Sequence, residues 1–221
     1  MAVGGERPMI GEQIKAFLQH GRQNITNVAL FLMFFIWCSV QLYTKWSEGR
    51  LDFIEMSFGV HNVVFAVLFL IRTKHSLFNE KVFDQSVAAL AFFSGAVFIG
   101  QPETASGSAL MLARAVIVAS NLLGLVTMLN LGRSFGVFIA FREIRTTGLY
   151  GLVRHPMYLT DILLRVGYLI SHFTAFIAVA FILSSACYVY RATLEERFLL
   201  NRPEYGEYLR RVKYRFIPYV Y

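Results

Sequence analysis

The stretch RATLEERFLL, residues 191–200, carries charged side chains at a spacing that suits chemistry on a bound molecule. Arg191 and Glu195 are four residues apart and would share one face of a helix, with Glu196 on the neighbouring face. A cation and two carboxylates would then project from one helix end and could bind and orient a charged group. The alternative is an exposed salt bridge between residues i and i+4, which stabilises a helix by only about 0.2–0.5 kcal/mol.

A second charged stretch, GLVRHPMY at residues 151–158, places cations directly before an apolar run. Pro156 suits the first turn of a helix, because its missing N–H has no intrahelical partner to lose and its φ is already fixed. His155 would then cap the helix N-terminus, where free backbone N–H groups and the helix dipole favour an anion such as a carboxylate. In the alternative interpretation this is an ordinary helix start at a membrane interface, with Arg154 reaching lipid phosphates.

The composition indicates an integral membrane protein. The 221 residues are 56% hydrophobic, which is too apolar for an ordinary soluble domain. The net charge of +7 would suit a nucleic-acid partner, but the cations lie in short loops beside apolar runs. Membrane topology explains them, so no nucleic acid is expected. Cys38 and Cys187 lie inside apolar runs without a second ligand at metal-binding spacing, so no metal site is expected.

The apolar runs predict about six transmembrane helices that form one all-α bundle. Residues 25–131 contain four of these spans, near 25–43, 53–71, 86–100 and 109–131. Residues 132–221 form a C-terminal region whose apolar sequence, 157–190, is split by Ser171 and His172 into two antiparallel helices, followed by a tail. Residues 1–24 form a polar N-terminal segment, either an interfacial helix or a loosely attached tail.

The distribution of Lys and Arg sets the orientation, because short cationic loops stay in the cytoplasm. The loop at 72–82 carries Arg72, Lys74 and Lys81, whereas the link at 101–108 has no cation. Six spans with both termini in the cytoplasm fit this distribution. The loop at 132–155 and the C-terminal tail then share the cytoplasmic side, so the two charged stretches are expected at one level of adjacent helices.

Several motifs resemble a known superfamily. They are NLGRSFG at 130–136, TTGLYGLVRHPMYL at 146–159, and EERFLL with YGEYLRRVKYRFIP in the tail. Together they are similar to the isoprenylcysteine carboxyl methyltransferase family and the related phospholipid N-methyltransferases. The resemblance implies a membrane bundle that binds S-adenosylmethionine in a cytosol-facing crevice and admits a lipophilic acceptor, isoprenylcysteine-like or lipid, sideways from the bilayer. A carboxylate, amine or thiol of that acceptor would receive the methyl group.

The resemblance also implies roles for individual residues. Arg191 and Glu195 would be catalytic, with Arg191 facing the acceptor and Glu195 holding the cofactor through its ammonium or ribose hydroxyls. Prenylcysteine enzymes tend to have a histidine where this chain has Arg142, so a different contact is expected there. The implied cofactor-binding residues are Arg142, Glu143, Ile144, Arg145, Tyr150, His155, Pro156, Met157, Tyr158, Glu195 and Glu196.

Asp161 and Arg165 are four residues apart on the helix that is predicted to begin at Pro156. Arg165 would lie roughly 13 Å from the helix start, close to the middle of the bilayer. A charge there costs at least about 2.5–3.5 kcal/mol, so it should face the bundle interior and be paired. Two interpretations stay open, an internal Asp161–Arg165 clamp and a pair of groups that grips the head group of the substrate.

Two other functions compete with methyl transfer. Membrane sterol and steroid reductases, which use NADPH, also resemble the C-terminal half, with a related Arg-His-Pro stretch and a similar YRFIPYVY ending. The arrangement of Arg191, Glu195 and Glu196 favours the methyltransferase. That reaction needs neither a metal nor a covalent nucleophile, because positioning and exclusion of water do most of the catalytic work. A non-catalytic membrane protein that kept the fold is the third interpretation.

Overall fold

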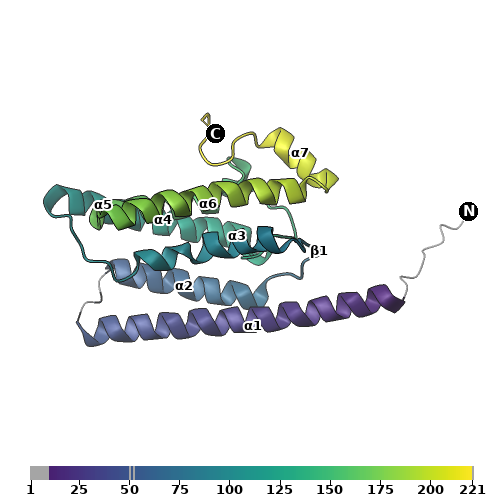
Figure 1. The fold of residues 1–221 in the computed structure, drawn as a ribbon, viewed down its shortest axis with the longest axis horizontal. Coiled ribbons are helices and arrows are strands. Elements are labelled where there is room, and N and C mark those ends of the chain that lie inside the picture. Colours follow the sequence, from purple (N-terminus) through teal and green to yellow (C-terminus); the bar gives the residue numbers. More distant parts are fainter. Residues whose placement is uncertain (1–9, 50, 52, 221) are drawn as a thin grey trace, which may run out of the picture.

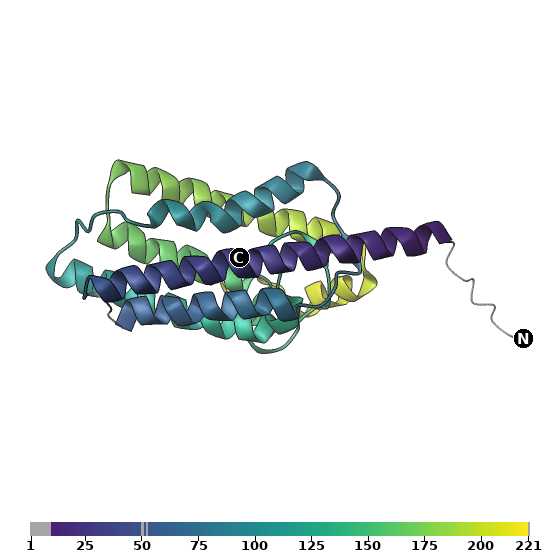
Figure 2. The same cartoon turned by 90° about the horizontal axis from the view of Figure 1, so that it is seen from below.

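A computed structural model of the chain describes residues 10–49, 51 and 53–220. Its long helices lie side by side along one direction, with α1 at one edge of the bundle and α7 on the opposite side (Figures 1 and 2). Within this part of the chain, one pair of two-residue strands is the only regular structure that is not helical. The predicted all-α class is therefore confirmed.

The helices of the N-terminal half begin and end close to the predicted spans. They are α1 (Ile10–Ser47), α2 (Phe53–Ile71), α3 (Val82–Phe93), which continues as the 3-10 helix η1 (Ser94–Phe98), and α4 (Gly107–Leu131). α1 is longer than predicted, because residues 10–24 form its first turns and are continuous with the span. The rest of the predicted N-terminal segment, residues 1–9, lies outside the described residues.

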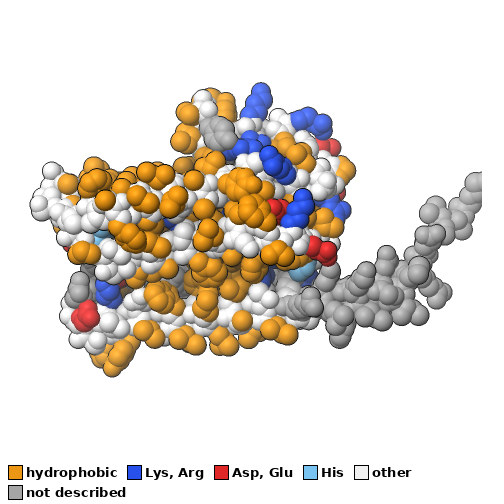
Figure 3. Space-filling model, viewed as in Figure 1, with side chains coloured by type: hydrophobic (Ala, Val, Ile, Leu, Met, Phe, Trp, Pro, Cys, Tyr) orange, Lys and Arg blue, Asp and Glu red, His pale blue; other side chains and the backbone are white. Residues whose placement is uncertain are grey.

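Four of the described helical segments are long and apolar enough to cross a membrane, by length and composition: Gln23–Ser47, Phe53–Ile71, Gly107–Ser134 and Ala175–Leu199. Large apolar side chains such as Ile36, Leu112 and Ile182 are exposed on their flanks, and apolar groups cover much of the bundle in Figure 3. Such surfaces suit contact with lipid. The chain is therefore an integral membrane protein, although two of the six predicted spans fall on shorter helices, Val82–Phe98 and Pro156–Ser171.

Pro156 is the first residue of α5 (Pro156–Ser171), as predicted, and His155 is its N-cap residue. A short turn leads into α6 (Ala175–Leu199), which runs back alongside α5. The tail contains a helix that the sequence did not predict, α7 (Pro203–Arg211), which buries Tyr205 and Tyr208. The C-terminal region is therefore a helical hairpin with a short helix packed on its end.

The loop between α4 and α5 and the C-terminal tail meet at one end of the bundle. The loop contains η2 (Gly132–Ser134), β2 (Ala140–Phe141) and η3 (Gly148–Gly151), and β2 pairs antiparallel with β1 (Leu77–Phe78). The backbone N–H groups of Arg154 and His155 donate to the carbonyls of Tyr214 and Arg215, both at 2.9 Å. These hydrogen bonds hold the tail across the start of α5.

The contact between α4 and α5 is the most extensive between any two of the described helices. Gly167 of α5 allows this contact, because a Cβ atom there would lie 2.6 Å from Cγ1 of Ile117 and 3.2 Å from the carbonyl oxygen of Ala113. Small residues permit such close approach between membrane helices.

Replacing Gly167 by alanine is expected to push α4 and α5 apart and to lower the free energy of unfolding by about 1–3 kcal/mol. Thermal denaturation of the full chain in detergent measures the loss. Gly206→Ala is the matched control, because nothing lies within 4 Å of a Cβ atom built at that position. Equal melting temperatures for the two variants would contradict the close packing at Gly167.

Candidate functional site

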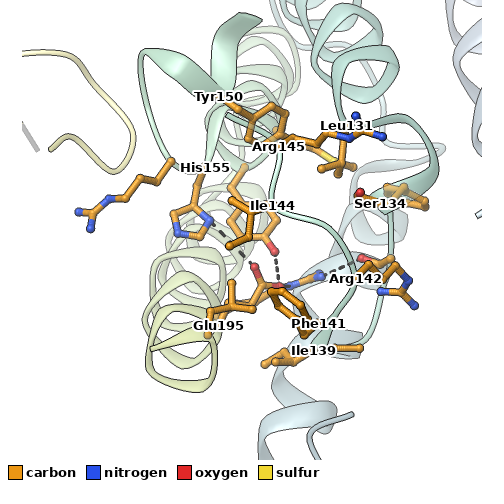
Figure 4. Close-up of a pocket in the computed structure, with 18 of the residues that line it drawn as sticks. Leu131, Ser134, Ile139, Phe141, Arg142, Ile144, Arg145, Tyr150, His155 and Glu195 are labelled. Carbon is orange, nitrogen blue, oxygen red and sulfur yellow. Dashed lines mark hydrogen bonds and ion pairs between the residues drawn. The ribbon is translucent and has the colours of Figure 1, made fainter. Parts of the chain in front are cut away.

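A cavity, here the central cavity, lies between α5, α6 and the loop at residues 134–145 (Figure 4). Most of the residues predicted to form a site line it together: Arg142, Glu143, Ile144, Arg145, Tyr150, His155, Met157, Tyr158, Asp161, Arg191 and Glu195. Pro156, Arg165 and Glu196 are not among its lining residues. The fold thus brings the two charged stretches and the loop between α4 and α5 together around one cavity.

Glu195 presents its carboxylate to the central cavity from α6. Tyr158 donates its hydroxyl to Oε1 of Glu195 at 2.5 Å, and Nε of Arg191 donates to the same oxygen at 3.1 Å. Oε2 lies 4.0 Å from Nδ1 of His155. Two donors therefore fix one carboxylate oxygen, and the other keeps lone pairs with which to accept from a ligand.

Arg191 is almost fully buried and ties α6 to two other elements. Its guanidinium donates to the backbone carbonyls of Ala88 in α3 at 3.1 Å and of Val137 in the loop at 2.6 Å, with a longer bond of 3.4 Å to Gly136. Together with the bond to Glu195, these contacts occupy most of the guanidinium donors. Arg191 lines the cavity, and its protein contacts make it a residue that positions Glu195.

Glu196 joins α6 to the start of α5 and to the tail. Nε2 of His155 hydrogen-bonds Oε1 of Glu196 at 3.1 Å, and Arg215 donates to Oε2 through Nη2 at 2.7 Å and through Nε at 3.0 Å. Nε of Arg154 lies 3.3 Å from Oε1. Glu196 is thus bound by other side chains of the protein and does not line the cavity. Pro156 does not line the cavity either, and its role is to begin α5.

Glu196→Gln is expected to loosen the tail, because the neutral amide cannot balance the charges of Arg154 and Arg215. Hydrogen exchange at the backbone amides of Arg154 and His155 should become roughly tenfold faster, which corresponds to about 1.4 kcal/mol of lost local stability. Glu204→Gln, at an exposed position of α7, is the control. Unchanged exchange in Glu196→Gln would contradict the role of this carboxylate.

Asp161 and Arg165 are not paired through their charged groups. Asp161 lines the central cavity and accepts a hydrogen bond from the hydroxyl of Tyr188 at 2.7 Å. Arg165 is buried and donates to the backbone carbonyl of Asp161 at 2.9 Å and to Oγ of Ser94 at 3.1 Å. Its guanidinium also lies 4.8 Å from the ring centre of Tyr188. Arg165 thus links α5 to η1 and α6, and only Asp161 reaches the cavity.

Burial shifts the ionisation of two groups at the loop side of the cavity. Burial lowers the pKa of Arg142 to about 10, and the carboxylate of Glu195 opposes this shift. Burial, with further contributions from Tyr208 and nearby carboxylates, raises the pKa of the Tyr150 phenol well above its ordinary value. At neutral pH the cavity therefore combines a charged guanidinium with a neutral phenol. Arg142 also donates Nε to the carbonyl of Thr73 at 3.2 Å.

Three buried polar atoms of lining residues lack a hydrogen-bond partner among the described residues: Oγ of Ser134, Nε of Arg145 and Nε of Arg154. The last of these is still close to a carboxylate, in the ion pair with Glu196. Nη2 of Arg145 lies 3.2 Å from the exposed carboxylate of Glu143. Buried polar groups are normally hydrogen-bonded, so the free hydroxyl and N–H are suited to a ligand that supplies an acceptor.

The cavity includes tyrosines that the sequence interpretation did not assign to it, Tyr188, Tyr205 and Tyr208. Tyr188 precedes Arg191 by three residues and Glu195 by seven, which is the spacing of one helix face. That periodicity was a signal available in the sequence. The sequence held no such signal for α7. Its Tyr208 is placed at the cavity by a tertiary contact, because the hydroxyl of Tyr208 donates to the carbonyl of Tyr150 at 2.7 Å.

The chain is similar to known proteins over part of its length. Residues 111–201 match the model of the isoprenylcysteine carboxyl methyltransferase (ICMT) family. A curated protein, the Delta(14)-sterol reductase TM7SF2 of Mus musculus, is 35% identical over 88 residues, which cover 36% of this chain and 20% of that protein. The match to the family includes all of α5 and α6, the helices that carry most of the two charged stretches. Residues 111–201 are therefore similar to the ICMT family.

Proposed function

We propose that this chain is an S-adenosylmethionine-dependent membrane methyltransferase that acts on a lipophilic acceptor. One observation carries the proposal: Glu195, held by Arg191 and Tyr158, presents a carboxylate to a buried cavity whose other walls bear cations and aromatic rings. The cofactor combines an ammonium, a carboxylate and a sulfonium in one molecule. A cavity with both charge signs and aromatic walls is the environment that such a molecule requires.

The lining residues fit the separate groups of the cofactor. Glu195 and Asp161 offer carboxylate oxygens to its ammonium and ribose hydroxyls. The unpartnered Nε of Arg145 and hydroxyl of Ser134 can donate to its carboxylate. The ring of Tyr158, together with that of Tyr150, can stabilise the sulfonium by a cation–π contact of about 0.5–2 kcal/mol.

When bound, S-adenosylmethionine supplies an electrophilic methyl group. The chain then has to hold the acceptor in line with that group and keep water out, which requires positioning more than acid–base chemistry. Glu195 is preorganised for this task, because Arg191 and Tyr158 fix its carboxylate before any ligand enters. Asp161 and Tyr188 form the part of the cavity farther along α5 and α6 from the loop, where the acceptor's reacting group would enter from the bilayer.

We further propose that the cavity opens toward the cytoplasm, with both termini on that side. The support is the distribution of charge: Arg142, Arg145 and Arg154 gather at the cavity end of the bundle, and several Lys or Arg side chains lie near α7 in Figure 3. Cationic segments beside membrane spans remain in the cytoplasm. Membrane lipids would surround the apolar flanks.

A second candidate function is favoured by the 35% identity to a Delta(14)-sterol reductase. A reductase that uses NADPH needs cations for the phosphates of a dinucleotide, and the cavity offers Arg142, Arg145 and Arg154. Against this, two carboxylates, those of Glu195 and Asp161, face the same cavity and would repel phosphates. The methyltransferase therefore accounts for more of the lining residues.

Binding of the two cofactors to the purified full chain in detergent distinguishes the candidates. We expect saturable binding of S-adenosylmethionine that unlabelled S-adenosylhomocysteine displaces and that excess NADPH leaves unchanged. Saturable binding of NADPH without binding of S-adenosylmethionine would overturn the proposal and favour the reductase.

A further inference from the structure

A second pocket, here the basic pocket, lies between residues 23–27 of α1, the end of α2 and η2. Its lining residues are Gln23, Asn24, Asn27, Leu70, Ile71, Arg72, Thr73, Lys74 and Arg133. Three of them are cations, and none of the described residues that line it is acidic. The pocket shares no lining residue with the central cavity. It is therefore a separate concentration of positive charge that the proposed methyl transfer does not use.

Arg72 is the buried cation of the basic pocket, with only 6% of its surface exposed. Its Nε donates to Oδ1 of Asn27 at 2.6 Å, but its buried Nη1 has no hydrogen-bond partner among the described residues. Burial, together with the charge of Arg142, lowers the pKa of Arg72 to about 10, so the guanidinium is still charged at neutral pH. A buried guanidinium nitrogen without an acceptor calls for an anion.

Backbone and amide contacts hold the pocket in shape. The backbone N–H of Thr73 donates to the carbonyl of Arg133 at 2.8 Å, and Nε of Arg133 donates to the carbonyl of Ile71 at 2.9 Å. Nε2 of the buried Gln23 donates to the carbonyl of Thr73 at 3.1 Å. The segment after α2 is thus fixed to both α1 and η2, and the three cations are brought together before any ligand is present.

The position of the pocket along the helices indicates where its ligand comes from. Candidate spans begin at Gln23, end at Ile71 and end at Ser134, so the ends of three spans meet at this pocket. The ends of membrane spans lie at the level of the lipid head groups. Lys74 and Arg133 are exposed there, whereas Arg72 lies deeper. A phosphate at head-group level could contact all three.

We propose that the basic pocket binds a phosphate group, through Arg72, Lys74 and Arg133, at the level of the lipid head groups. The phosphate is carried by an anionic phospholipid of the surrounding leaflet or is free inorganic phosphate. Arginine suits this ligand because its planar fork donates two hydrogen bonds to one phosphate. The amides of Asn24 and Asn27 complete a set of donors around the anion.

The test measures thermal protection of the full chain in detergent by two probes, dioleoylphosphatidylglycerol and inorganic phosphate. Phosphatidylglycerol is expected to raise the melting temperature saturably. The double variant Lys74→Gln/Arg133→Gln should require roughly thirtyfold more lipid for the same protection, because each of the two cations near a membrane surface contributes about 1 kcal/mol and about 1.4 kcal/mol corresponds to tenfold. Arg72→Gln, which removes the unpartnered Nη1, should show the same loss.

A matched control removes two exposed cations elsewhere, Arg210 and Arg211 of α7, by glutamine substitution. Its lipid titration should follow the wild type. Inorganic phosphate could instead raise the melting temperature as much as the lipid does, with the effect lost in the same variants. That result assigns the site to a free anion. Lys74→Gln/Arg133→Gln changes only exposed side chains and keeps the buried Arg72. The site can therefore be tested even if the Arg72→Gln variant misfolds. Undiminished protection of Lys74→Gln/Arg133→Gln by both probes would overturn the site.

Discussion

Replacing Glu195 by glutamine is expected to weaken binding of S-adenosylmethionine roughly 10–100-fold, because a hydrogen bond to a charged group contributes about 1.5–3 kcal/mol. The amide keeps the size of the side chain and can still accept from Tyr158, whose hydroxyl lies 2.5 Å away. The change therefore removes charge with little change in shape. Equilibrium binding of labelled cofactor to the full chain in detergent measures the loss.

The control for this variant is Glu207→Gln, which neutralises an exposed carboxylate of α7. Its cofactor affinity should equal that of the wild type, which excludes a general effect of net charge. The melting temperature of Glu195→Gln is measured alongside, because Arg191 loses a charged partner. Wild-type cofactor affinity in a folded Glu195→Gln protein would show that this carboxylate serves only to hold Arg191, and the proposed site would be wrong.

Replacing Arg191 by methionine is expected to cost about 3–5 kcal/mol of unfolding free energy, because it leaves a partly buried carboxylate without its cation. The substitution also removes the donors to the carbonyls of Ala88 and Val137. These bonds hold α3 and the loop against α6, so both elements should separate from it. Thermal or urea denaturation in detergent measures the loss, and Arg197→Met, at an exposed position of the same helix, is the control.

A double variant isolates the contact between the two side chains. Arg191→Met combined with Glu195→Gln should lose less stability than the sum of the single variants, because the carboxylate that would be left unpaired is then neutral. Additive losses would mean that Arg191 stabilises the fold through the backbone carbonyls alone. In that case Arg191 would not position Glu195.

The sequence by itself determined the long helices, and most of the residues that it predicted for a site line the central cavity. The length of apolar runs predicted α2 at residues 53–71 with both ends correct, and the fixed φ of proline predicted the start of α5 at Pro156. Local rules suffice for these features, because a helix in lipid must satisfy its own backbone hydrogen bonds. Helices also form at residues 82–98 and 156–171, but they are shorter than a typical crossing helix, so their length alone does not identify them as spans.

Only the tertiary structure decided which of the charged side chains face the cavity and which hold the fold together. Glu195 and Glu196 are adjacent residues of the same type. Glu195 nevertheless lines the cavity, whereas Glu196 is paired with Arg215 of the tail. Consecutive residues on a helix point about 100° apart, so their partners depend on which elements pack on each side. The tail and α7 supply those partners, and no local pattern predicted where they would lie. The same holds for Arg72, whose approach to Asn27 joins residues far apart in the chain.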